Sequence, residues 1–143
     1  MTAPSQQGAS RAQRLGVTAG SLVQSINADD DVPSDLLDEL RAASGEDLVP
    51  EGAYDVVDIV LLWWREDDGD LVDALVDARR QLSDEGSLWL LTPKAGRPGH
   101  VEPSDVLEAV PTAGLVQTGN LNVAGEWSGT KLDAPKGGHR KQR

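Results

Sequence analysis

The residues best suited to chemistry in this chain lie in the loop 94–100 and at one serine. Lys94, Arg97 and His100 stand close together in a segment that also holds two glycines. Cationic side chains and the backbone N–H groups of a glycine-containing loop can bind an anionic group. With Ser128 near them, these residues would hold a small anionic or nucleotide-like ligand. The alternative that stays open is a loop of ordinary solvated charges.

Covalent catalysis has little support in the sequence. The chain contains no cysteine, which excludes disulfides, thiolate zinc sites and a cysteine nucleophile. It contains two histidines. A Ser-His-Asp triad would have to use His100, and no Gly-x-Ser-x-Gly elbow presents a serine to it. The glycine-rich dinucleotide fingerprint and the phosphate-binding Lys-Ser/Thr loop are also missing. These observations favour a chain that is not an enzyme, holds no metal and takes no cofactor.

Three consecutive carboxylates, Asp29, Asp30 and Asp31, follow the first strand-like segment. Nucleotide-binding folds place glycines there, and carboxylates would repel a phosphate. A hard cation prefers oxygen ligands, so weak binding of magnesium or calcium is one alternative to a solvated turn. We predict instead that these residues and Trp127, near the sheet edge, form a surface for an unidentified protein partner, because exposed large aromatics concentrate interface energy.

The charge balance bears on the class of partner. The chain of 143 residues has 13 Lys and Arg against 24 Asp and Glu, for a formal net charge of -11. An acidic core of this kind repels phosphates, so we predict no direct contact with nucleic acid. The longest apolar run, 56–64, is interrupted by Asp58 and is shorter than the roughly 20 residues that span a bilayer. The N-terminus has no apolar signal region, so we predict a soluble cytoplasmic protein without membrane contact.

Strand-like and helix-like segments alternate along the chain, which predicts the α/β class. Apolar and β-branched runs predict strands at 21–26, 56–64, 88–92, 115–123 and 127–132. Apolar residues at helical spacing predict three helices, from Pro33 to Gly45, from Leu71 through Leu82 to a stop at Gly86, and from Pro103 to Pro111. Parallel neighbouring strands need helical crossovers. This order therefore predicts a three-layer sandwich with a mainly parallel, Rossmann-like sheet and an antiparallel C-terminal end.

Two local features refine this arrangement. Asp68 or Asp70 is expected to cap the second helix at its positive end. Trp63 and Trp64 are adjacent on one strand, so alternation sends their side chains to opposite faces of the sheet, where core packing is the main interpretation.

The predicted domain boundaries follow composition. Residues 1–14 are polar and small without apolar periodicity, so we expect a flexible tail. Residues 15–133 would form the single α/β domain. Residues 134–143 contain four basic residues and no acidic residue. We expect a second flexible tail there that folds back on the acidic domain, touches polyanions weakly or only aids solubility.

Several blocks of sequence, in order, resemble a known bacterial family. The blocks are Leu15-Gly16, Val23-Gln24, Asp29 to Val32, Asp55 to Asp58, Leu62 to Arg65, Leu88 to Lys94, Gly99 to Asp105, Pro111 to Leu115 and Trp127 to Thr130. In these blocks, which cover nearly everything between the tails, the chain is similar to the bacterial domain-of-unknown-function 3052 family. The resemblance supports the α/β fold and implies no catalytic residue, because the activity of that family is not established.

More distantly, the order of elements and the antiparallel ending resemble a shortened Rossmann-like domain of the S-adenosylmethionine-dependent methyltransferase type. That resemblance implies a cofactor pocket after the first strand and an acidic residue for a ribose. The glycine-rich loop is replaced here by 27–31, and Glu46 and Asp47 are the candidates for the acid. We therefore expect the cofactor pocket to be absent or unable to bind, with the fold retained after its site is lost.

Two functions are predicted from these observations. The leading prediction is a small non-catalytic domain that acts through protein contacts, with a regulatory role as one form of it. The alternative is binding of an anionic or nucleotide-like ligand by a degenerate methyltransferase-like domain. Convergence of Lys94, His100 and Ser128 on one concave site would favour the alternative.

Overall fold

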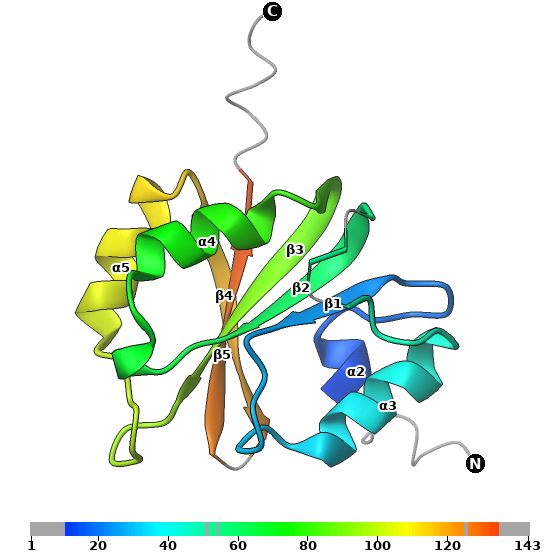
Figure 1. Cartoon of the computed structure of the whole chain (residues 1–143), viewed down its shortest axis with the longest axis horizontal. Helices are drawn as coiled ribbons and strands as arrows, with labels where there is room; N and C mark the ends of the chain where they lie inside the picture. Colours follow the sequence, from blue (N-terminus) through cyan, green and yellow to red (C-terminus); the bar gives the residue numbers. More distant parts are fainter. Residues whose placement is uncertain (1–10, 51, 54, 125, 135–143) are drawn as a thin grey trace, which may run out of the picture.

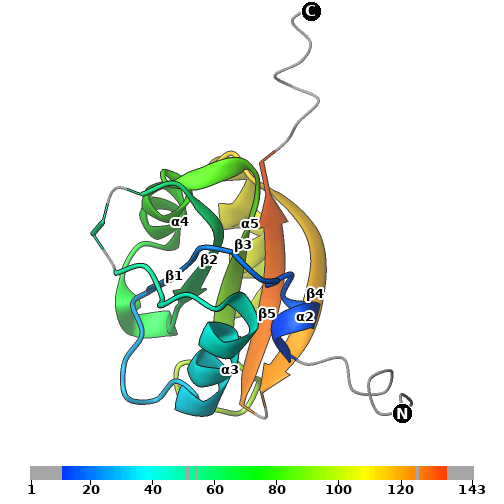
Figure 2. The same cartoon turned by 90° about the vertical axis from the view of Figure 1, so that its right-hand side faces the viewer.

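A five-stranded sheet with helices on both faces forms the core of the protein (Figures 1 and 2). The computed structural model describes residues 11–50, 52–53, 55–124 and 126–134. The helical elements are α2 (Arg11–Arg14), α3 (Ser34–Ser44), the 3₁₀ turn η1 (Glu66–Asp68), α4 (Leu71–Arg79) and α5 (Pro103–Thr112). The strands are β1 (Val23–Ile26), β2 (Val57–Trp63), β3 (Leu82–Pro93), β4 (Val116–Ala124) and β5 (Trp127–Asp133). Helices α2 and α3 lie on one face and α4 and α5 on the other, which confirms the predicted three-layer α/β sandwich.

The strand order β1-β2-β3-β5-β4 combines a parallel half with an antiparallel half. Strands β1, β2 and β3 run parallel, and β5 runs antiparallel to both of its neighbours, β3 and β4. This confirms the predicted Rossmann-like sheet, which is parallel in its first strands and antiparallel at its C-terminal end. Strand β5 is therefore an interior strand, and β4, although it comes earlier in the chain, lies at the edge.

Successive segments of the chain are placed on opposite sides of β1 in the sheet. After α3, Val49 pairs with Gln24 in a single bridge on the outer side of β1, and the chain then returns to β2 on the other side. Open α/β sheets bind ligands outside the carboxyl ends of the strands at such a reversal, the topological switch point. The loop that follows Ile26 is therefore the place where a cofactor would be expected.

Side chains alternate along β2 between two apolar cores. Ile59, Leu61 and Trp63 pack in the core beneath α2 and α3, and Val60 packs in the core beneath α4 and α5. Trp64 continues the second core, so the two adjacent tryptophans face opposite sides of the sheet as predicted. Burial on both faces explains why this strand is an almost continuous apolar run.

Helix starts and stops follow most of the predicted signals. Helix α3 ends at Gly45, which takes a left-handed φ of 77°. Helix α4 begins at Leu71 and is capped by Asp70, whose carboxylate accepts the N–H of Asp73 at 3.2 Å. Helix α5 holds Pro111 near its end. Among the described residues, no helix combines the length and apolar character that crossing a membrane requires.

The end of α4 corrects one prediction. The helix stops at Arg79, and the segment from Leu82 to Gly86, predicted as the helix end and its stop, is the first part of β3. Leu82 fits helical spacing, but it pairs with Val57 of β2. A Cβ on Gly86 would lie 2.7 Å from the carbonyl oxygen of Asp58. Glycine is needed here because another backbone approaches closely, and not because a helix ends.

The folded part of the chain begins earlier than the predicted boundary at residue 15. Ala12 of α2 is fully buried, and the guanidinium of Arg11 donates to the carboxylate of Glu39 in α3 at 2.9 Å. The last turn of the segment 1–14 therefore belongs to the domain. The rest of that segment, and the C-terminal residues 135–143, lie outside the described residues.

Candidate functional site

Arg65 occupies the switch point at the carboxyl ends of β1 and β2. Its Nε donates to Oδ2 of Asp31 at 3.0 Å, and its Nη2 pairs with the other oxygen of the same carboxylate. Its Nη1 donates to the carbonyl oxygen of Asn27 at 2.9 Å and lies 3.3 Å from Oδ2 of Asp68. The Arg65 side chain is 14% exposed. Through these bonds Arg65 ties the loop after β1 to the turn η1.

Asn27 completes the Arg65 cluster, which we define as Asn27, Asp31, Arg65 and Asp68. The Asn27 amide nitrogen donates to the carbonyl oxygen of Trp63 at 2.9 Å and to Oδ2 of Asp68 at 3.0 Å. Its backbone has a φ of 65°, a left-handed conformation that asparagine tolerates better than most residues. The cluster therefore joins the ends of β1 and β2 through hydrogen bonds within the protein.

The indole of Trp127 lies against Arg65 and is buried, which corrects the predicted contact surface. The guanidinium carbon lies 5.3 Å from the indole centroid, and Trp63 meets the ring edge to face with centroids 5.0 Å apart. The indole N–H donates to the carbonyl oxygen of Asp31 at 3.3 Å. Trp127 is 4% exposed. The prediction placed Trp127 near a sheet edge, but β5 lies between β3 and β4, so its first residue is covered.

The three consecutive aspartates differ in their surroundings. The hydrogen bond from Arg65 lowers the pKa of the Asp31 carboxyl, and the same bond raises the pKa of Arg65. Asp29 and Asp30 are exposed, and the Asp29 carboxylate accepts the N–H of Asp30 at 2.8 Å. Across the described ranges, no three histidine or acidic side chains are placed to hold a metal ion. Asp31 is exposed as well, but its carboxylate is paired with Arg65, which leaves Asp29 and Asp30 as the aspartates of the predicted contact surface without a cationic partner among the described residues.

The contact between Asp31 and Arg65 makes stability depend on pH. We expect the free energy of unfolding to fall as the pH drops below about 4. The folded pKa of Asp31 lies below its ordinary value of 3.8, so its ionised form stabilises the folded state above that value. This contribution is lost as the pH falls through the folded pKa. Urea unfolding at neutral and acidic pH measures the loss, which should be smaller for Asp31→Asn; an equal loss in both chains would contradict the assignment to Asp31.

The two acids predicted for a ribose lie at the other end of the sheet from the switch point. Glu46 and Asp47 precede Val49, whose bridge to Gln24 runs parallel to β1. Residues before a parallel bridge lie toward the amino ends of the strands, whereas the switch point lies at the carboxyl ends. Neither acid is therefore in position for a ligand bound beside the Arg65 cluster.

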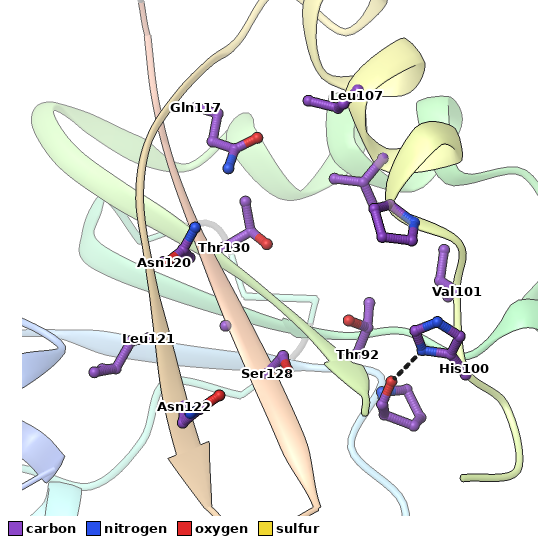
Figure 3. Close-up of a pocket in the computed structure, with 14 residues that line it drawn as sticks. Thr92, His100, Val101, Leu107, Gln117, Asn120, Leu121, Asn122, Ser128 and Thr130 are labelled. Carbon is purple, nitrogen blue, oxygen red and sulfur yellow. Dashed lines mark hydrogen bonds between the residues drawn. The ribbon is translucent and has the colours of Figure 1, made fainter. Parts of the chain in front are cut away.

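A separate cavity of about 610 Å³ lies between α5 and the strands β4 and β5 (Figure 3). Uncharged polar side chains on the sheet face turned toward α5 line one side of it, and we call this set the polar floor. Its members are Thr92 of β3, Ser128 and Thr130 of β5, and Gln117, Asn120 and Asn122 of β4. The register explains the set, since Asn122 pairs with Ser128, and Ser128 pairs with Thr92. Side chains directly opposite one another share one face of a sheet.

The side of the cavity formed by α5 is apolar. Pro103, Val106 and Leu107 line it, and we call them the apolar wall. Among the described residues, none that lines the cavity is Asp, Glu, Lys or Arg, although these types make up 26% of the chain. In the part of the chain that the structure describes, the side chains of the polar floor have no hydrogen-bond partner from the protein. Gln117, Asn120 and Asn122 are exposed, so the cavity is open to solvent on the side of β4 and presents uncharged hydrogen-bonding groups there.

His100 lines the end of the cavity next to Pro93. Its Nδ1 lies 2.9 Å from the carbonyl oxygen of Pro93, the contact dashed in Figure 3. A carbonyl oxygen can only accept, so Nδ1 carries a proton, and Nε2 of the neutral ring is then an acceptor.

The structure brings together two of the four residues predicted to bind an anion. His100 and Ser128 line the cavity, whereas Lys94 and Arg97 do not. The guanidinium of Arg97 pairs with the carboxylate of Glu126 at 2.8 Å, and the backbone N–H of Lys94 donates to the carbonyl oxygen of Glu126 at 3.0 Å. The loop is thus fastened to the turn between β4 and β5. The predicted convergence of cations with His100 and Ser128 does not occur.

Most of the polar floor lies outside the sites predicted from the sequence. A usable signal is present in β4 and β5, where Asn120 and Asn122, and Ser128 and Thr130, occupy alternate positions. Alternate positions share a face, and a helix-covered face is normally apolar. The sequence also contains a signal for Arg65, because this residue is a lone cation between an apolar run and an acidic turn.

Three comparisons relate this chain to known proteins. The family described as "Protein of unknown function (DUF3052)" matches residues 12–136. Uncharacterized proteins of Mycobacterium bovis and Mycobacterium tuberculosis are 45% identical over 125 residues, which is 87% of this chain and 78% of theirs.

Solved structures of methyltransferases share the fold. A TehB-like SAM-dependent methyltransferase from Corynebacterium glutamicum is similar with a TM-score of 0.54 and 13% identity, over 92% of each chain. A SAM-dependent methyltransferase from Aquifex aeolicus has a TM-score of 0.59 and 11% identity, over 91% of this chain and 88% of its own. At these identities the similarity concerns the fold alone.

Proposed function

We propose a function from this premise: the chain belongs to the family of proteins of unknown function DUF3052 and has a Rossmann-like, methyltransferase-type fold. It is a non-catalytic binding domain that takes a small molecule in the cavity between α5 and the strands β4 and β5. The observation that carries this proposal is the polar floor, a set of uncharged side chains that line the cavity, are open to solvent at Gln117, Asn120 and Asn122, and have no hydrogen-bond partner among the described residues.

The residues at the switch point do not fit S-adenosylmethionine. The Arg65 side chain crosses the end of β1 and is bonded to Asn27 and Asp31 of the loop that would hold the cofactor. No glycine in 27–31 lets backbone approach a ligand closely. The N–H of Asp30 is already bonded to the Asp29 carboxylate. No methyl-transfer step therefore follows from this site.

The cavity between α5 and the sheet has the properties of a ligand site. Its volume of about 610 Å³ falls within the range of roughly 300–1,000 Å³ that small-molecule sites occupy. Such sites combine an apolar surface with a few polar groups that fix the orientation of the ligand. The apolar wall supplies the first and the polar floor the second. Lys94 and Arg97 are missing from the described lining, which argues against the anionic ligand predicted from the sequence.

A fragment screen followed by amide NMR tests this site. We expect binding fragments to shift the amide resonances of Asn120, Asn122 and Ser128, which lie on the floor of the cavity. Ser128→Leu should abolish these shifts, because the larger side chain projects into the cavity. Thr118→Val, on β4 but outside the lining, is the matched control and should leave them intact. A screen in which no fragment shifts these resonances overturns the proposal.

The switch point is tested separately with S-adenosylmethionine. At millimolar concentration the cofactor should leave the amide resonances of Asn27, Asp31 and Arg65 unshifted, because the Arg65 cluster occupies the place where it would bind. Saturable shifts of these resonances would contradict the closure of the switch point.

We also propose contact with a protein partner as a second function. The exposure of Asp29 and Asp30 favours it, together with the Arg65 cluster that holds their loop beside the acidic turn η1. A positively charged partner would complement this end of the sheet. Replacing both residues with asparagine should weaken such a partner's affinity, whereas neutralising the exposed Asp84 and Glu85 should not. Equal affinity for both double variants would contradict this surface.

A further inference from the structure

We infer that the ligand of this cavity is an uncharged ring compound with hydrogen-bonding groups on its edge, the chemistry shared by nucleobases and sugars. The inference rests on the proposed function and names the class of molecule that the site would take. Three properties of the cavity carry it: the absence of lining charge, the mixture of donors and acceptors, and the placement of polar and apolar surfaces opposite each other.

The scarcity of charge in the lining disfavours ionised ligands. A phosphate or carboxylate in the cavity would lose hydration without gaining a lysine or arginine partner from the described lining, because Lys94 and Arg97 lie outside it and Arg97 is paired with Glu126. The net charge of -11 adds long-range repulsion of an anion. An ammonium group would likewise find no carboxylate in the lining. The cavity therefore favours molecules without formal charge.

The polar floor offers both donors and acceptors. Each of the three amide side chains, Gln117, Asn120 and Asn122, has an N–H donor pair and a carbonyl acceptor, and each hydroxyl can act in either role. His100 adds Nε2, which is an acceptor in the neutral ring because the Nδ1 proton is then directed to the carbonyl oxygen of Pro93. A matching ligand carries N–H or O–H donors and carbonyl or hydroxyl acceptors on the same edge.

The spacing of the floor suits a ring. Thr92, Ser128 and Asn122 form one row across three strands, and Asn120 and Thr130 stand in the next row. Neighbouring strands lie about 4.8 Å apart, and successive side chains on one face follow at about 7 Å. A substituted ring can contact two strands at this spacing.

The apolar wall accounts for the other surface of the ligand. Leu107 is 61% exposed on α5, whereas Val106 of the same apolar wall is buried. A ring placed between the wall and the floor would cover this side chain and keep its polar edge on the sheet (Figure 3). Both nucleobases and sugars have an apolar face and a polar edge, so both satisfy the arrangement.

Pairs of probes that differ by one phosphate test the inference. The pairs are uridine with uridine monophosphate, and N-acetylglucosamine with N-acetylglucosamine phosphate. Dissociation constants come from the amide shifts of Asn120, Asn122 and Ser128. We expect at least one uncharged probe to bind and its phosphorylated form to bind on the order of tenfold more weakly. The pair that binds identifies the nucleobase or the sugar.

Two lysine variants sharpen the test. Asn122→Lys supplies the missing cation inside the cavity and should reverse the preference toward the phosphorylated probe. Thr112→Lys adds the same charge on α5 outside the lining and should leave the preference unchanged.

The results that overturn the inference are distinct from failure of the proposed function. The inference is overturned if the phosphorylated probes bind the unchanged chain as tightly as the uncharged ones. It is also overturned if neither uncharged probe shifts these resonances while other fragments do, and in both cases the cavity still binds small molecules. If no fragment of any kind shifts them, the proposed function fails together with the inference.

Discussion

Replacing Trp127 with alanine is expected to lower the free energy of unfolding by about 3–5 kcal/mol. The indole is 4% exposed, meets Trp63 edge to face at 5.0 Å, and lies 5.3 Å from the guanidinium carbon of Arg65. Its removal leaves a cavity beside Trp63 and Arg65. It also removes the indole N–H that donates to the carbonyl oxygen of Asp31. Urea unfolding followed by far-ultraviolet circular dichroism measures the loss, because this signal does not depend on the replaced fluorophore.

Two further variants keep this prediction testable if Trp127→Ala fails to fold. Trp127→Phe retains an aromatic ring but loses the indole N–H and part of the buried area, and should cost about 1–2 kcal/mol. Leu107→Ala is the control, since Leu107 is 61% exposed and should cost less than about 0.5 kcal/mol. If the cost of Trp127→Phe or Trp127→Ala matched that control, the indole would not be part of the core and would return to the predicted contact surface.

Local patterns predict the elements of this fold because their signals lie within a few residues of one another. The apolar run of β2 is buried on both faces, Gly45 ends α3 and Asp70 caps α4. The end of α4 is different, because the position of Leu82 satisfies helical spacing and strand pairing equally well. Its pairing with Val57, a residue far away in sequence, decides the outcome.

Both candidate sites depend on contacts between distant segments, which local patterns do not contain. The burial of Trp127 results from the insertion of β5 between β3 and β4. The polar floor depends on the register that aligns Thr92, Ser128 and Asn122, and a shift by one residue would turn the floor to the other face. The sequence does contain the residue types of the floor, and only the pairing of strands shows that they share a cavity.

Replacing Arg65 with alanine is expected to lower the free energy of unfolding by about 2–3 kcal/mol. Breaking a buried ion pair costs roughly 3–5 kcal/mol, and we reduce this figure because the Asp31 side chain is 50% exposed. The loss includes the bond to the carbonyl oxygen of Asn27 at 2.9 Å and the cover over the Trp127 ring. Urea unfolding at neutral pH measures it.

Arg80 is the matched control for Arg65. It pairs with Asp77 at 3.5 Å, both side chains are largely exposed, and Arg80→Ala should cost less than about 0.5 kcal/mol. Arg65→Lys should recover only part of the loss, because an ammonium keeps the charge but cannot bond both oxygens of Asp31 in a fork. A double-mutant cycle with Asp31→Asn should give a coupling of about 1–2 kcal/mol. If Arg65→Ala cost no more than the control, the guanidinium would not fasten the loop after β1 to the turn η1, and the proposed closure of the switch point to S-adenosylmethionine would lose its physical cause.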